Sequence, residues 1–124
     1  MNSKVFMVLR ILLGLFVLVF GLNKFFHFIP MDAPTGDAGA YFGALMSTKT
    51  LTLVAIVEVL AGLALIFNKF GALMAVILMS VAVNAVLFHA TLDPGNIAGA
   101  AVMLLLNIAV LFGYKGRYKD ILRA

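Results

Sequence analysis

The 124-residue chain contains no cysteine, no tryptophan and only three prolines. Without cysteine it can form no disulfide, no CxxC redox pair, no iron–sulfur cluster and no thiolate metal site. If the protein takes part in electron transfer, a bound small molecule or a partner must therefore carry the electrons. Charge is also scarce: 11% of the residues are charged and 65% are hydrophobic, whereas about a quarter of the residues of a soluble domain are charged. This composition indicates a membrane protein.

Four apolar runs approach the length of about 20 residues that a membrane-spanning helix needs. They are residues 5–22, 51–67, 70–88 and 97–114, and they leave no room for a separate soluble domain. We therefore predict an all-α fold: one integral membrane domain, residues 1–124, built as an up-down-up-down bundle of four transmembrane helices. Short links favour this topology, with a long outer loop only between the first and second helices.

The connections differ sharply in length. Residues 68–69 join the second and third helices, and residues 89–96 join the third and fourth through the turn signal Asp93-Pro94-Gly95-Asn96. The long segment 24–50 contains a short stretch, 41–46, that can form an amphipathic helix at the interface. This segment is either a plain connector or a lid over the outer end of the bundle, and its aromatic content favours the lid.

The first apolar run also has features of a signal peptide, because Lys4 and Arg10 precede or enter it. Cleavage would require small residues after the apolar region. Here the run ends in Asn23-Lys24-Phe25-Phe26, which offers no such site. We therefore expect an uncleaved first helix.

Positive charge gathers at one end of the expected bundle. With four helices both termini lie on the same face of the bundle. The basic residues expected on that face are Lys4, Lys69, Lys115, Arg117, Lys119 and Arg123, and its one acidic residue is Asp120. An excess of Lys and Arg marks the cytoplasmic side, so we expect both termini in the cytoplasm. The basic tail suits a topology signal and an anchor for anionic lipid better than a nucleic-acid patch, since its four basic residues are spread over nine positions.

Two opposite charges, Arg10 and Glu58, lie inside apolar runs, where a charge is costly and usually has a structural or functional purpose. The helical rise places Arg10, Glu58 and Asn107 at about 9, 15 and 12 Å from the inner end. We therefore predict a buried Arg10–Glu58 charge pair with Asn107 close by. The pair is either a structural lock, whose loss would cost about 3–5 kcal/mol, or a proton-accepting Glu58 controlled by Arg10.

A second group of polar residues lies near the outer end, beside several phenylalanines. A histidine there can hydrogen-bond a ligand carbonyl, and a lysine can hold an anionic group; alternatively, the histidines are ordinary interfacial residues and the lysine snorkels. The ligand-binding candidates, with Asn107 added from the inner cluster, are Asn23, Lys24, His27, Asn84, His89 and Asn107.

Recognisable catalytic machinery is missing from the sequence. It shows no Ser-His-Asp arrangement, Gly-rich phosphate loop or HExxH motif. Two histidines are too few for a zinc site, which normally needs three or four ligands. We predict no catalytic residue and no metal site, which favours an accessory protein over a stand-alone enzyme.

Several segments resemble the DoxX family over nearly the whole chain. The family's first-helix signature resembles two segments of this chain, Arg10-Ile11-Leu12-Leu13-Gly14 and Phe20-Gly21-Leu22-Asn23-Lys24-Phe25. Its second-helix signature resembles Glu58-Val59 followed by Gly62. The end of its third helix resembles residues 84–89 followed by Asp93-Pro94. The family residues carried over are Arg10, Gly14, Gly21, Lys24, Phe25, Glu58 and Gly62.

This resemblance implies a small four-helix inner (plasma) membrane protein of bacteria. Members of the family include a subunit of a thiosulfate:quinone oxidoreductase and proteins associated with thiol-handling and superoxide-detoxifying partners. The missing cysteines put direct sulfur chemistry by this chain in doubt.

Residues and resemblance together suggest two functions. The first is an accessory subunit of a membrane redox system, which binds a quinone or a lipid at the outer polar group and works with a redox-protein partner. The second is a non-catalytic scaffold or assembly protein that docks a partner through its tail or outer loop. The lipid bilayer is an expected partner and nucleic acid is not; a homo-oligomer is left open, and transport would require one.

Overall fold

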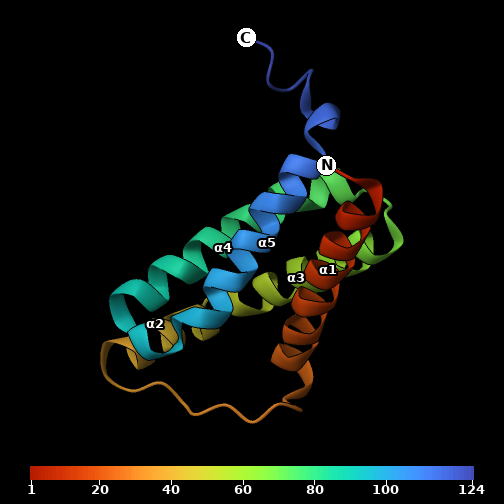
Figure 1. The fold of residues 1–124 in the computed structure, drawn as a ribbon. Coiled ribbons are helices and arrows are strands. Elements are labelled where there is room, and N and C mark those ends of the chain that lie inside the picture. Colours follow the sequence, from red (N-terminus) through yellow and green to blue (C-terminus); the bar gives the residue numbers. More distant parts are fainter.

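The computed structural model describes all residues, 1–124, as helices, turns and short loops (Figure 1). The elements in chain order are α1 (Ser3–Phe26), α2 (Gly36–Ser47), α3 (Thr50–Phe67), α4 (Gly71–Leu92), the 3-10 helix η1 (Pro94–Asn96), α5 (Ile97–Gly113) and the 3-10 helix η2 (Lys115–Tyr118). Four helices are long and apolar enough to cross a membrane: α1, α3, α4, and α5 together with η1. The predicted all-α fold with four spans is confirmed.

Two spans are longer than the apolar runs that predicted them. α1 continues past residue 22 to Phe26, and it ends where His27 adopts a left-handed conformation and donates its backbone N–H to the Asn23 carbonyl. α4 continues past residue 88 to Leu92, and Pro94 follows, which cannot extend the hydrogen-bonding pattern. Polar residues near helix ends stay helical because backbone hydrogen bonds, not hydropathy, set the boundary. The helix α2, with 12 residues, is likewise longer than the predicted 41–46.

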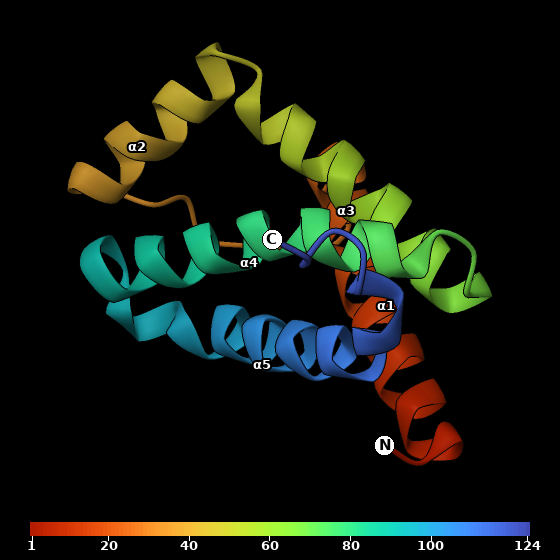
Figure 2. The same ribbon diagram turned by 90° about the horizontal axis from the view of Figure 1, so that it is seen from above.

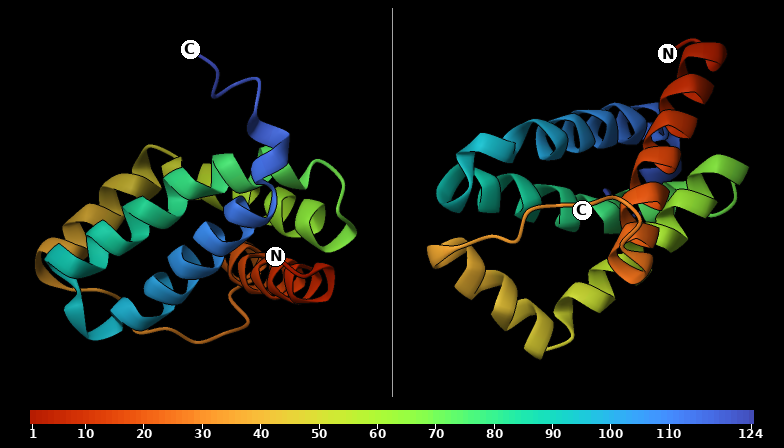
Figure 3. Two further views of the ribbon diagram at one scale, coloured as in Figure 1. Left: turned by 45° about the horizontal axis from the view of Figure 1, so that its top comes forward. Right: turned by 90° about the horizontal axis from the view of Figure 1, so that it is seen from below.

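The spans form two antiparallel pairs. α1 packs on α3 and α4 packs on α5, and the pairs meet through contacts of α3 with α4 and of α1 with α5. Figures 2 and 3 show α4 and α5 side by side while α1 crosses α3 at an angle. We call the end that contains Ser3, the turn 68–70 and Gly113 the terminal end, and the end that contains Phe26, α2 and η1 the loop end.

Glycines allow the close crossing of α1 and α3. A Cβ atom added to Gly62 would lie 2.7 Å from the Leu18 Cβ and 2.8 Å from the Gly14 carbonyl oxygen. A Cβ added to Gly21 would lie 2.9 Å from the Glu58 Cβ. Small residues are typical where membrane helices approach closely. Gly14, Gly21 and Gly62, which the family resemblance pointed to, therefore lie at the contact between α1 and α3.

Apolar side chains fill the interior and also cover the outside. The core consists mainly of Leu13, Val17, Ala61, Leu65, Ala75, Leu78, Ala82, Met103, Val110, Tyr114 and Tyr118. The outward surfaces of the spans carry exposed leucines, isoleucines and valines, such as Leu12, Leu63, Leu73, Leu105 and Ile108. An apolar exterior of this extent would be unfavourable in water but matches hydrocarbon. The chain is a multi-pass membrane protein.

Candidate functional site

Arg10 and Glu58 are both buried, with 8% and 3% of their surface exposed, but they do not pair. The Glu58 carboxylate accepts a hydrogen bond from Lys24 Nζ at 2.6 Å, and the two form an ion pair. Arg10 instead donates from Nη1 to the Leu65 carbonyl and, at 3.1 Å, to the Ile66 carbonyl. The predicted Arg10–Glu58 pair is wrong, and Lys24, which we had assigned to the outer ligand group, takes the place of Arg10.

The relative axial shift of α1 and α3 explains this exchange of partners. Gly21 lies level with Glu58, and Arg10 precedes Gly21 by eleven residues, about 16 Å along the helix. Helical side chains tilt toward the N-terminus of their own helix. In this antiparallel pair Lys24 therefore leans toward Glu58 and Glu58 leans toward Lys24.

Arg10 stabilises the C-terminal end of α3. The last four carbonyls of an α-helix have no partner within the helix, and the end of the helix dipole attracts a positive charge. Leu65 and Ile66 lie in that last turn, so the guanidinium satisfies groups that hydrocarbon would leave unpaired. Arg10 Nε itself is buried without a hydrogen-bond partner.

Asn107 also makes a separate contact instead of joining the predicted inner cluster. Its side chain is completely buried, and Nδ2 donates to the Ala75 carbonyl of α4 at 3.0 Å. The amide oxygen has no partner. Arg10, Glu58 and Asn107 thus form no hydrogen bonds with one another, and Asn107 joins α5 to α4.

The predicted outer group divides into two parts, and the first organises the end of α1. Asn23 Oδ1 accepts a hydrogen bond from the Ile29 backbone N–H at 2.7 Å, and Nδ2 lies 3.9 Å from the Met31 sulfur. His27 is exposed in the left-handed position that ends α1. Asn23 and His27 therefore direct the chain into the loop.

The second part lies where α2 reaches the loop end of α4. Asn84 Nδ2 donates to the Tyr41 hydroxyl at 3.1 Å, and the Tyr41 ring stacks on Phe88 with centroids 5.1 Å apart and an angle of 18°. Phe42 meets Phe88 edge-on at 5.0 Å, and His89 meets it at 4.9 Å. We call these five residues, Tyr41, Asn84, Phe88, His89 and Phe42, the loop-end cluster. Through them α2 packs over the end of α4, as the lid interpretation requires.

Two details of the loop-end cluster were not foreseen. Asn84, a predicted ligand-binding residue, is exposed on the side of α4 and donates to the Tyr41 hydroxyl. Tyr41 was not among the predicted site residues. Its place in the amphipathic stretch 41–46 was the only signal that could have identified it. His89 Nδ1 lies 3.3 Å from an Asp93 carboxylate oxygen, which orients the ring.

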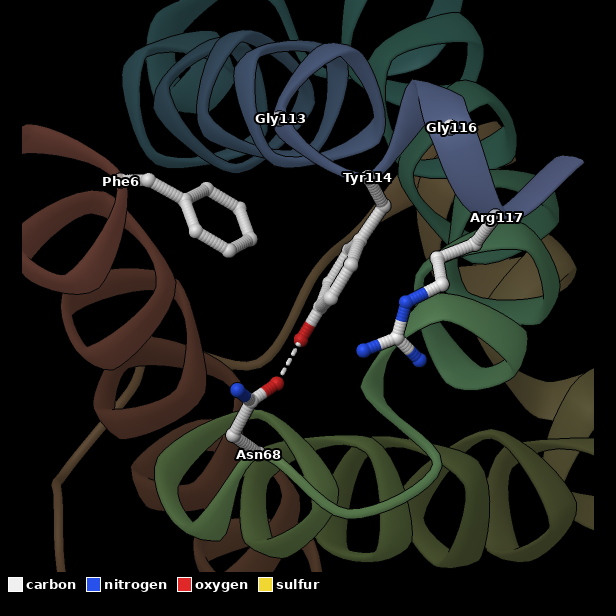
Figure 4. Close-up of a pocket in the computed structure, with 6 residues that line it drawn as sticks. All are labelled: Phe6, Asn68, Gly113, Tyr114, Gly116 and Arg117. Atoms are coloured by element: carbon white, nitrogen blue, oxygen red, sulfur yellow. Dashed lines mark hydrogen bonds between the residues drawn. The ribbon is translucent and has the colours of Figure 1, made fainter. Parts of the chain in front are cut away.

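A further concave surface lies at the terminal end and includes none of the predicted ligand-binding residues (Figure 4). This depression of about 340 Å³ is lined by Phe6, Asn68, Gly113, Tyr114, Gly116 and Arg117. The Tyr114 hydroxyl donates to Asn68 Oδ1 at 2.5 Å, and Phe6 meets the Tyr114 ring edge-on at 4.8 Å. Burial raises the pKa of Tyr114, although the charges of Arg10 and Arg117 oppose that rise. The phenol therefore stays a protonated donor at neutral pH.

These observations define a four-helix membrane protein with one buried ion pair, a polar aromatic cluster at one end and a basic depression at the other. The DoxX family model matches residues 5–91, from α1 to nearly the end of α4, and the chain belongs to this family. The resemblance predicted from the sequence is thus confirmed. No curated protein and no solved structure matches the chain.

Proposed function

We propose that this protein is an accessory subunit of a membrane redox system and that it binds a quinone-like or lipid molecule at the loop-end cluster. The observation that carries the proposal is the grouping of Tyr41, Asn84 and His89 around the Phe88 ring. Of the predicted outer group, only Asn84 and His89 belong to it; Asn23, Lys24 and His27 have other structural contacts, and Asn107 lies inside the bundle.

The chemistry of the cluster suits a quinone head group. A quinone is a flat ring with two carbonyl oxygens, so it requires stacking surfaces and hydrogen-bond donors. Phe42 and Phe88 offer aromatic surfaces, which favour offset or edge-on contact, and the Tyr41 hydroxyl, the Asn84 amide and the His89 ring offer donors.

The lipid-facing side of α4 provides room for an apolar tail. Val83 and Leu87, which flank Asn84 and Phe88 along the helix, are about half exposed. A tail that leaves the cluster along this side would lie in hydrocarbon against these side chains. The same arrangement would hold a lipid whose polar group reaches the cluster.

In this proposal the chain binds the quinone and leaves electron transfer to a partner protein. The chain contains no cysteine, and no three His or acidic side chains lie close enough together to hold a metal ion. The family relationship to a thiosulfate:quinone oxidoreductase subunit agrees with such a division of labour.

Titration of the purified protein with decylubiquinone in detergent tests the proposal. Loss of one hydrogen bond should weaken binding about fivefold, so Tyr41→Phe, which keeps the ring, Asn84→Ala and His89→Ala should each have this effect. Ser80→Ala is the matched control, because Ser80 is exposed one turn before Asn84 and bonds only to the Ile77 carbonyl of its own helix. Unchanged affinity in the triple variant would refute the loop-end site.

A scaffold role is the second candidate, and the exposed basic C-terminal segment favours it. Figure 1 shows this segment leaving the bundle at the terminal end, where a partner can reach it. Removing residues 119–124 should then abolish co-purification of the partner. The same set of co-purifying proteins after truncation would argue against docking through the tail.

A further inference from the structure

We propose that the depression at the terminal end is a binding site for the phosphate of an anionic phospholipid. The proposal does not depend on the proposed function, because the depression lies at the opposite end of the bundle from the loop-end cluster. It rests on the shape of the depression, on the unpaired positive charge around it and on its place at the end of the spans.

Residues from three separate parts of the chain form the depression. Phe6 comes from α1, Asn68 from the turn between α3 and α4, and Tyr114 and Arg117 from the segment that follows α5. The Tyr114–Asn68 hydrogen bond and the Phe6–Tyr114 contact hold these parts together. Figure 4 shows Phe6 and the Arg117 guanidinium on opposite sides of the Tyr114 ring, with Asn68 at the hydroxyl end of that ring.

The positive charge at this site has no partner within the protein. The ion pairs of the chain are Lys24–Glu58, His89–Asp93 and Arg123–Asp120, so Arg117 faces no carboxylate. Arg10 does not line the depression and is bonded to the carbonyls of Leu65 and Ile66 at the end of α3. The exposed Arg117 guanidinium at the depression, with no carboxylate beside it, favours an anionic ligand.

The polar groups of the depression are suited to phosphate. The Tyr114 hydroxyl donates to the Asn68 amide oxygen, which fixes the orientation of the amide. The Asn68 Nδ2 group makes no hydrogen bond within the protein and can donate to a ligand. A guanidinium binds phosphate through two parallel hydrogen bonds. Phosphate oxygens only accept hydrogen bonds, which matches these donors.

The position of the depression favours a phospholipid over a soluble phosphate. The depression lies where α1 begins and α5 ends, which is the level of the lipid head groups for helices that span the membrane. Val5 and Phe112, the chain neighbours of Phe6 and Gly113, are half exposed or more. Acyl chains of a lipid bound by its phosphate would therefore continue along apolar side chains.

Native mass spectrometry of the full chain, titrated with phosphatidylglycerol in detergent, tests this site. Loss of a charge-assisted hydrogen-bond pair should weaken binding about tenfold, so Arg117→Gln should reduce the one-lipid complex by this factor, and Arg117→Lys should do so partially. Arg123→Gln is the matched control: it removes the same charge from the same segment, but Arg123 pairs with Asp120. Its affinity should stay within about twofold of wild type.

The other outcomes separate the alternatives. Equal losses in Arg117→Gln and Arg123→Gln would mean general attraction to a basic tail and would overturn the site. Equal binding of phosphatidylcholine would overturn its anionic preference, and displacement of phosphatidylglycerol by glycerol 3-phosphate would identify a soluble phosphate as the ligand. Arg117 is exposed and makes no side-chain hydrogen bond, so its variants should unfold at the wild-type temperature without lipid.

Discussion

A buried carboxylate in a membrane-spanning helix needs a partner, and for Glu58 that partner is Lys24. The Glu58 side chain is 4% exposed and the Lys24 side chain is 27% exposed, so the pair lies at the boundary between the core and the outside of α1. Breaking a buried pair by removing one member leaves the other charge without compensation, which is more damaging than replacing both.

Replacing Lys24 should therefore destabilise the protein more than replacing both members of the pair. We expect Lys24→Met to lower the free energy of unfolding by about 3 kcal/mol, and Lys24→Met with Glu58→Met to recover most of that loss. Thermal or SDS-induced unfolding in micelles measures both effects. Lys4→Met, at an exposed position of the same helix, is the control, and a Lys24→Met protein as stable as wild type would contradict the structural role.

Sequence patterns identified the buried charges correctly but not their contacts. Hydrophobic runs made Arg10 and Glu58 stand out, and the family resemblance pointed to Gly14 and Gly62, which lie at the contact between α1 and α3. The partner of each charge depends on how far α1 is shifted along α3, which periodicity within one helix does not specify. The contacts of Tyr41 and the place of Arg117 beside Tyr114 were not foreseen for a related reason: each residue lies outside the spans, and its surroundings depend on what folds against it.

At the scale of helices, the crossing of α1 and α3 depends on the absence of side chains. Gly14 and Gly62 bring the two backbones together. At Gly62 no flexible side-chain end could yield to a larger residue, since the nearest atoms are the Leu18 Cβ and Cα and the Gly14 carbonyl oxygen. The same contact aligns Lys24 with Glu58 and Arg10 with the end of α3.

A single added methyl group should disturb this crossing. We expect Gly62→Ala to lower the free energy of unfolding by about 1–3 kcal/mol, because it overpacks the contact. Gly99→Ala is the same substitution in α5, where an added Cβ meets nothing within 4 Å, so it should be neutral or slightly stabilising. Equal stability of the two variants in a micelle unfolding assay would show that the crossing tolerates side chains.

The helices themselves were largely predictable. Hydrocarbon selects long apolar segments, so each of the four runs corresponds to a span, and errors appear only near the ends. At the ends, capping hydrogen bonds determine where a helix stops. Asn23 and Lys24 look like loop residues in a hydropathy profile, but they belong to α1. The length of α2 was underestimated because its glycines weaken the helical pattern.

At the scale of the whole molecule, charge is distributed unevenly between the two ends. Basic residues gather at the terminal end, near both termini, while the loop end carries Asp32, Asp37 and Asp93. By the positive-inside rule the terminal end should face the cytoplasm.

The lack of cysteine makes this orientation simple to test. Single-cysteine variants at Ser3, Ser47 and Ala124 should respond differently to a membrane-impermeant maleimide applied to intact spheroplasts. We expect Ser47→Cys, at the end of α2, to react in intact cells, and Ser3→Cys and Ala124→Cys to react only after lysis. Reaction of the two terminal variants in intact cells would reverse the orientation.

The pairing of α1 with α3 also has a consequence for how the chain enters the membrane during synthesis. Lys24 leaves the ribosome well before Glu58, which follows 34 residues later, so the first span must wait beside the insertion channel without its counter-ion. Lys24 lies near the end of α1 and can keep its ammonium group at the membrane surface in this interval. Glu58 lies in the middle of α3 and cannot place its carboxylate at the membrane surface. It enters the membrane after Lys24, however, and meets a positive charge already in position.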